Sequence, residues 1–135
     1  MTTREDIESF IIRMDTDYQE VDEGMWLIKP EEDEPGVVVN YSPPVVLLRL
    51  KVMDLPGNGD DARFAGLYRR LLELNATDIL HGSYGIEENE VVLSDALELE
   101  DLDFSELRSS YESMTMASSG HLPELVGLVP VVQEG

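Results

Sequence analysis

The stretch Leu67–Asp95, LYRRLLELNATDILHGSYGIEENEVVLSD, joins a helical pattern to a strand pattern. Around its start, apolar residues recur at the three- and four-residue spacing of one helix face: Phe64, Leu67, Tyr68, Leu71 and Leu72. Asn75 tolerates the left-handed conformation, so it is expected to close this helix. Two strands are predicted next, at Ile79–Tyr84 and Glu90–Leu97, joined by an acidic turn. The stretch therefore predicts a helix followed by a β-hairpin.

The motif HGSYG at His81–Gly85 resembles the turn that presents a catalytic serine. Such a nucleophile elbow needs glycine two residues before and two residues after the serine, and a helix after it. His81 stands where the first glycine is required, and a hairpin is predicted in place of the helix. Ser83 is therefore not expected to be catalytic. Gly82 and Gly85 are instead expected to permit a bulge or close packing against a helix.

The histidines and acidic clusters do not form a metal-binding pattern. His81 and His121 are far apart, and neither belongs to the H-x-x-x-H or H-x-H spacing of zinc sites. Asp54–Asp61 contains glycine, but Ala65 stands where a calcium loop needs its distal glutamate. The other acidic runs fall where hairpin tips and helix starts are expected, which is typical of solvated turns. We therefore expect no metal, no cofactor and no enzymatic activity.

The first half of the chain predicts a helix and three strands. Thr3 is a candidate cap for a helix whose apolar face is made of Ile7, Phe10, Ile11 and Met14 and which fades near Asp15 to Tyr18. Strand patterns follow at Met25–Ile28, Gly36–Ser42 and Val45–Met53, with a break at Pro43-Pro44. The links between these strands are too short for parallel crossovers, so an antiparallel meander is expected.

The second half predicts two helices and a separate tail. The helix around Leu67 is expected to be capped by Asp60 or Asp61, and the last helix starts in a capping box at Asp103–Glu106. Ser118–Gly120 is expected to end the last helix, because the residues beyond show no helical spacing. The predicted order is α-β-β-β-α-β-β-α, an α+β domain at residues 1–117 with helices packed on an antiparallel sheet, followed by an apolar tail at residues 118–135.

Charge is the strongest global property of the 135 residues. Nine Lys and Arg against 29 Asp and Glu give a formal net charge of −20. Nucleic acid and anionic membrane surfaces would be repelled, whereas basic partners would be attracted; solubility alone is the other reading of the charge. The chain has no cysteine, no apolar signal segment and no run long enough to span a membrane. A cytoplasmic protein is therefore expected.

Leu67–Asp103 resembles the YbjN family and the wider group of class I type III secretion chaperones typified by CesT. The residues that carry the resemblance are Leu74-Asn75, Ser83-Tyr84-Gly85, Glu87-Glu88-Asn89, Val91-Val92-Leu93 and Leu99–Asp103. The likeness covers Arg4–Ala117 and implies the type III secretion chaperone-like fold. It also implies a non-enzymatic protein that binds another polypeptide, commonly as a homodimer. Secretion chaperones hold an extended cargo segment on hydrophobic patches, whereas YbjN-type members are similar to regulators.

Apolar residues beyond the three helical stripes are the candidate contacts for such a partner. They are Val45, Leu47, Met116, Leu125, Val126 and Leu128. A partner segment is expected to pair with a sheet edge or to lie in apolar patches. The competing hypothesis is a small-ligand-binding protein or an enzyme, with a pocket near the second helix that uses His81, Asp54 or neighbouring acids.

Overall fold

The computed structural model describes residues 1–29, 35–57 and 62–130, which form three α-helices, one short 3-10 helix and six strands. The elements are α1 Arg4–Arg13, β1 Tyr18–Asp22, β2 Met25–Ile28, β3 Val37–Ser42, β4 Val45–Asp54, η1 Ala62–Phe64, α2 Ala65–Thr77, β5 Ser83–Glu87, β6 Glu90–Glu98 and α3 Phe104–Gly127. Among these described residues, no helix is long and apolar enough to cross a membrane.

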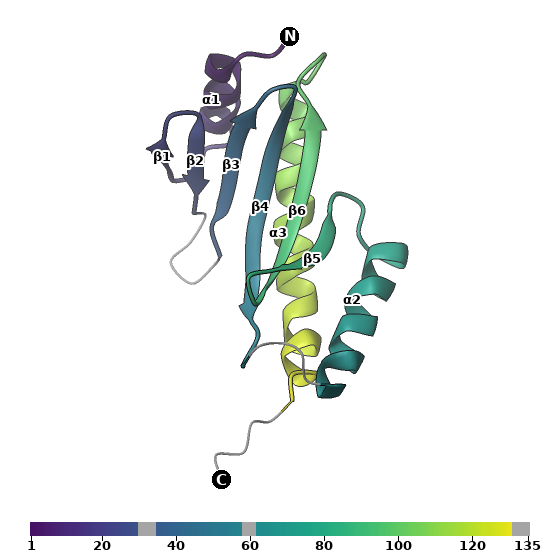
Figure 1. Ribbon diagram of the computed structural model, residues 1–135. Helices are drawn as coiled ribbons and strands as arrows, with labels where there is room; N and C mark the ends of the chain where they lie inside the picture. Colours follow the sequence, from purple (N-terminus) through teal and green to yellow (C-terminus); the bar gives the residue numbers. More distant parts are fainter. Residues whose placement is uncertain (30–34, 58–61, 131–135) are drawn as a thin grey trace.

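The six strands make one sheet in the order β1-β2-β3-β4-β6-β5 (Figure 1). Every neighbouring pair is antiparallel, and β2, β3 and β4 form the predicted meander. The predicted α+β class, with an antiparallel sheet and packed helices, is confirmed. Because β6 inserts between β4 and β5, the two edges of the sheet are β1 and β5.

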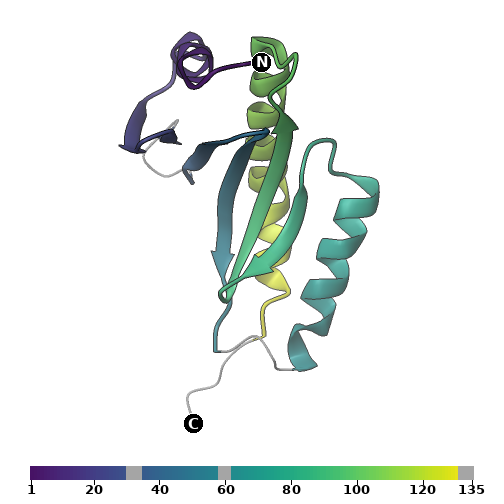
Figure 2. The ribbon, with the colours of Figure 1, turned by 45° about the horizontal axis from the view of Figure 1, so that its top comes forward.

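The two faces of the sheet differ in burial. On one face, Val46, Leu48 and Leu50 of β4 are buried, and α3 runs along β4 and β6 there (Figures 1 and 2). On the other face, Leu47 and Arg49 alternate with them and are exposed. We call this second side the open face; it carries Leu27, Val38, Leu47, Arg49, Lys51, Ser94 and Ala96. The alternation follows from the two-residue period of a strand.

The cap predicted for α1 is present, and α3 has one of the two hydrogen bonds of its predicted capping box. The Thr3 hydroxyl accepts a hydrogen bond from the Asp6 amide, and the Asp6 carboxylate accepts one from the Thr3 amide. The Asp103 carboxylate accepts from the Glu106 amide at 2.8 Å at the start of α3. These contacts satisfy amides that have no partner inside the helix. The predicted caps Asp60 and Asp61 lie outside the described residues.

The structure contains a strand, β1, that the sequence pattern did not indicate. All five of its residues are exposed, so Tyr18–Asp22 has no buried side to produce an alternating pattern. Its register comes from pairing with β2, for example Gln19 opposite Leu27. An all-exposed edge strand leaves little trace in hydrophobic periodicity.

The connection between α2 and β5 differs from the prediction at two points. Asn75 does not close α2, which continues to Thr77, so the predicted helix end is wrong. The predicted strand start at Ile79 is also wrong, because the Ile79 amide still bonds to the Leu74 carbonyl and β5 begins at Ser83. Asn75 is used differently, since its side chain bonds to the backbone of Tyr84.

The predicted end of the last helix at Ser118–Gly120 is wrong, because α3 continues to Gly127 through Pro123. Leu125 is fully buried in the core, and His121 and Glu124 contact side chains of the α2 region. Tertiary contacts therefore stabilise a helical segment whose glycine and proline content is unfavourable on its own. The predicted absence of a helix is corrected for residues 118–127, and residues 131–135 lie outside the described part.

Candidate protein-binding site

Val45 and Leu47 lie on the open face, at one end of β4. Leu47 is opposite Ala96 of β6 and is 38% exposed, and Val45 is half-buried opposite Glu98. A hollow of about 490 Å³ adjoins Leu47, with Arg49, Ser83, Ser94 and Ala96 among its lining residues. The lining mixes aliphatic, hydroxyl and guanidinium groups. This region can therefore contact both apolar and polar groups of a ligand.

Ion pairs follow the same face toward the far end of β4. The Arg49 guanidinium lies 2.6 Å from the Glu87 carboxylate of β5. The Lys51 ammonium lies 2.9 Å from Asp54 and 3.5 Å from Glu90, and its hydrogen bond to Asp54 raises the pKa of Lys51. All of these side chains are solvent-exposed, so the pairs contribute little to stability. Their basic members are neutralised locally in a strongly acidic chain.

The other predicted contacts lie on α3 or at its C-cap, away from the open face. Met116 is 75% exposed, and Val126 and Leu128 are exposed near the end of the helix. Leu125 has no exposed surface and belongs to the hydrophobic core, so in this fold its side chain stabilises α3. Helix α3 packs on the buried face of β4 and β6 (Figure 1), whereas Leu47 lies on the open face, so the structure does not bring Met116 together with Leu47.

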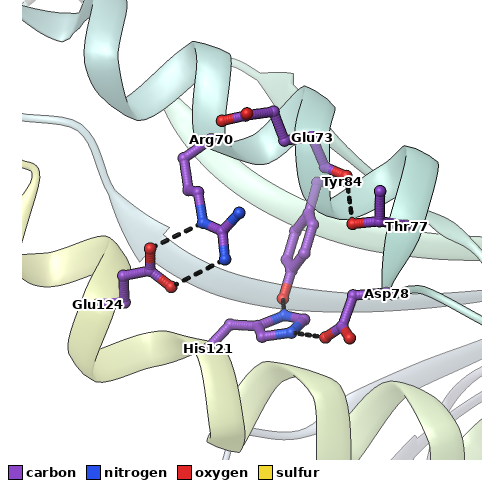
Figure 3. A network of polar contacts seen from close by, with 7 residues as sticks. All are labelled: Arg70, Glu73, Thr77, Asp78, Tyr84, His121 and Glu124. Carbon is purple, nitrogen blue, oxygen red and sulfur yellow. Dashed lines mark hydrogen bonds and ion pairs between the residues drawn. The ribbon is translucent and has the colours of Figure 1, made fainter.

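A polar network that the sequence did not indicate links α2, β5 and α3 (Figure 3). The Asp78 carboxylate can only accept, so the His121 Nε2 carries a proton and donates to it. In the neutral imidazole, the His121 Nδ1 then accepts from the Tyr84 hydroxyl at 2.7 Å. The three residues are up to 43 positions apart in the sequence, so no local spacing pattern could have predicted their contact.

A second contact lies beside this network. Arg70 of α2 donates to Glu124 of α3, with 2.7 Å between Nε and Oε2 (Figure 3). The hydrogen bond to Glu124 is the main reason that the pKa of Arg70 is raised, and Glu73 and Asp78 add to it. Together, the His121 and Arg70 contacts hold the last two turns of α3 against α2.

The Tyr84 hydroxyl is expected to lose its proton at a higher pH than an ordinary tyrosine does. Burial and then the negative charge of Asp78 raise the pKa of Tyr84 from 10.0 to about 12. Because the folded pKa lies above the unfolded one, this stabilisation is complete below pH 10 and is lost as the pH rises through about 12. The ¹³Cζ chemical shift of each of the five tyrosines, followed against pH, would measure this. A Tyr84 signal that titrates near pH 10 would contradict the prediction.

Of the groups in the competing ligand hypothesis, an acid at the end of the second helix, Asp78, meets a histidine, but that histidine is His121 and not His81. Asp54 pairs with Lys51, and His81 is half-buried and outside the network, which uses His121 instead. Within the described ranges, no three His, Asp or Glu side chains are placed to hold a metal ion. Gly82 and Gly85 were predicted to permit a bulge or close packing against a helix, but the β5–β6 pairing has no register shift and neither glycine lies close to a helix. The φ of Gly82 is +86°, and its backbone lies against Ser94 of β6.

Residues 1–130 match the model of the CesT_Tir_1 family. The chain belongs to the CesT_Tir_1 family. The match confirms the resemblance drawn from Leu67–Asp103, and it extends past Ala117 to include all of α3. No curated protein matches the chain significantly.

This CesT_Tir_1 chain shares its fold with solved structures of both groups that it resembles. One chain of the ExoU–SpcU complex from the type III secretion system of Pseudomonas aeruginosa is 15% identical, with a TM-score of 0.66 over 87% of this chain and 95% of that one. One chain of the HopA1–SchA chaperone–effector complex is 12% identical, with a TM-score of 0.61 over 85% of this chain and 88% of that one. YbjN from E. coli is 11% identical, with a TM-score of 0.67 over 90% and 92%. At these identities the likeness establishes the fold.

Proposed function

We propose that this CesT_Tir_1 member is a non-enzymatic, cytoplasmic protein-binding module that holds a partner polypeptide, as a chaperone or as a regulatory adaptor. Family membership over residues 1–130 supports a role in binding protein. Two of the similar folds were solved as complexes, ExoU with SpcU and HopA1 with SchA. The observation that carries the proposal in this chain is an open sheet face on which Leu47 stays exposed beside a hollow of about 490 Å³.

The open face offers a partner apolar contact bordered by charge. Leu27, Val38 and Leu47 lie on neighbouring strands, so their side chains form one surface across β2, β3 and β4. Arg49 and Lys51 continue the same face and can exchange their present carboxylate partners for those of a ligand. An apolar centre with a polar border is the usual composition of a protein-binding surface.

Edge pairing is more favourable at β1 than at β5. On β5, the Tyr84 amide donates to Asn75 at 2.7 Å and the Tyr84 carbonyl accepts from Asn75 at 3.1 Å. Asn75 therefore occupies the backbone groups with which an incoming strand would pair. On β1, all five residues are exposed and the far edge carries no neighbouring described strand. A partner strand would extend the sheet from β1 with the least rearrangement.

A homodimer stays part of the proposal. The outer side of α2 and β5 is a candidate surface for it, because Leu72 and Ile86 are exposed there beside an apolar hollow of about 240 Å³. Exposed apolar groups of this kind are suited to self-association. Sedimentation equilibrium of the purified chain would distinguish the monomer from the dimer.

The function is tested by partner capture with a paired variant. We expect the tagged chain to retain one dominant protein from lysate of its native organism at moderate salt, and Leu47→Asp to lower its affinity at least about tenfold. Ile12→Asp is the control, because Ile12 is an exposed apolar residue of α1 outside the open face. Both substituted residues are exposed, so the core is unchanged and the circular dichroism spectrum of each variant should match that of the parent.

Two results would contradict the proposal. One is the capture of only basic proteins that are released when salt is added, since that indicates screening of a nonspecific charge attraction. The other is an equal loss of partner affinity in Leu47→Asp and Ile12→Asp, which would show that the open face is not the binding site.

A further inference from the structure

Leu80 and Met116 stand out among the exposed apolar side chains. They are 87% and 75% exposed, and apart from the chain-terminal Met1 no large apolar side chain of the described residues is as exposed. Leu80 lies in the connection between α2 and β5, and Met116 lies in the middle of α3. Both line one hollow of about 460 Å³, which we call the α3 groove. The fold thus brings two exposed apolar residues that are distant in the sequence to one depression.

The α3 groove is lined by one face of α3 and by the end of α2. Ser113, Met116, Ala117 and Gly120 follow the three- and four-residue spacing of one helix face, and Asp78 and His121 complete the lining. A methyl group added at Gly120 would meet no atom within 4 Å, so the groove is open there. The His121–Asp78 and Arg70–Glu124 contacts hold its two walls together (Figure 3). The groove therefore exists before any ligand binds.

The charge around the α3 groove is negative. Its lining contains Asp78, whose side chain is 60% exposed, and no lysine or arginine. The nearby Arg70 is paired with Glu124 (Figure 3), and the negative charges of Glu73 and Asp78 also act on it. A cation placed at the rim would therefore be attracted by the local carboxylates and by the net charge of −20.

We propose that the α3 groove binds a partner segment in which an apolar side chain is flanked by lysine or arginine. The apolar side chain would lie between Leu80 and Met116, and the cation would face Asp78. A methionine wall adapts to side chains of different shape. A second copy of this chain would bring a charge of −20 to an acidic rim, and an anionic lipid surface would be repelled. The inference rests on the proposed protein-binding function and adds a site distinct from the open face.

Methionine methyl signals provide a local readout for this proposal. The chain has six methionines, among them Met116 in the α3 groove, Met114 in the core and Met25 on the open side of β2. The full chain, labelled with [methyl-¹³C]methionine, would be titrated with a short synthetic peptide that carries one leucine between lysines. We expect the Met116 signal to shift and those of Met114 and Met25 to stay. Replacing the lysines by glutamate, or the leucine by serine, should raise Kd at least about tenfold.

A variant pair tests the groove itself. Leu80→Ser should raise Kd for the lysine-flanked peptide about tenfold, whereas Ile12→Ser should leave it unchanged, because Ile12 lies on α1. The proposal is overturned if Met116 does not respond, or if the glutamate-flanked peptide shifts it equally. A response at Met25 with Met116 unchanged also overturns it and leaves the open face as the binding site. If Met116 responds but no partner is captured from lysate, the groove assignment stands and the proposed function fails.

Discussion

Replacing Gly82 by alanine is expected to lower the free energy of unfolding by about 3 kcal/mol or more. Gly82 has a φ of +86°, which is unfavourable for any residue with a Cβ. An added Cβ would also overlap the Ser94 carbonyl oxygen and lie 3.1 Å from the Ser94 carbonyl carbon. Those are backbone atoms of β6, so they cannot move aside without shifting the β5–β6 pair. Urea unfolding followed by circular dichroism measures the change.

Gly85, three residues further along, is the matched control. A Cβ at Gly85 would meet no atom within 4 Å, and its φ does not lie in the left-handed region. Gly85→Ala should therefore change stability by less than about 0.5 kcal/mol or increase it slightly, because alanine restricts the unfolded chain. Equal effects of the two substitutions would show that Gly82 is not held against Ser94.

Replacing Asn75 by alanine is expected to cost about 2–3 kcal/mol, because it leaves two backbone groups of an edge strand without partners. The Asn75 side chain both accepts from the Tyr84 amide and donates to the Tyr84 carbonyl. Those groups face away from β6, so no strand of the described sheet can replace the amide. Hydrogen exchange measured by NMR should show the Tyr84 amide exchanging at least about tenfold faster in the variant.

Thr77→Ala is the control for Asn75→Ala. The Thr77 hydroxyl donates only to the Glu73 carbonyl one turn back at 2.9 Å, and it is exposed. Its loss should change stability by less than about 0.5 kcal/mol. If Asn75→Ala costs no more than Thr77→Ala, or leaves the exchange of Tyr84 unchanged, the side chain does not cover this edge. The β5 edge would then be as available to a partner strand as β1.

The accuracy of prediction differs between elements for identifiable reasons. Strand β4 was predicted because Leu48 and Leu50 alternate with Arg49 and Lys51, and burial on one face produces that alternation. Helix α1 was predicted because its cap at Thr3 and its stripe at Ile7 and Ile11 are local features. Strand β1 was missed because it is exposed on both sides and exists through pairing with β2.

The candidate sites show the same division. Leu47 and Met116 were recognised as apolar residues outside the main stripes, and both are exposed. Leu125 looked equivalent in the sequence, yet it is fully buried, because α3 continues through Pro123 and turns this residue toward the core. The α3 groove could not be predicted, since Leu80 and Met116 belong to elements whose contact depends on long-range packing.

The sequence by itself determined the α+β class, the meander of β2 to β4, the hairpin after α2 and the absence of a serine elbow in HGSYG. These depend on side-chain period, turn residues and spacing, which are local properties of the chain. Only the tertiary structure decided the length of α3, the role of Asn75 and the meeting of Tyr84 with His121 and Asp78. Each of these depends on a contact between residues distant in sequence, and the free energy of such contacts outweighs local propensity.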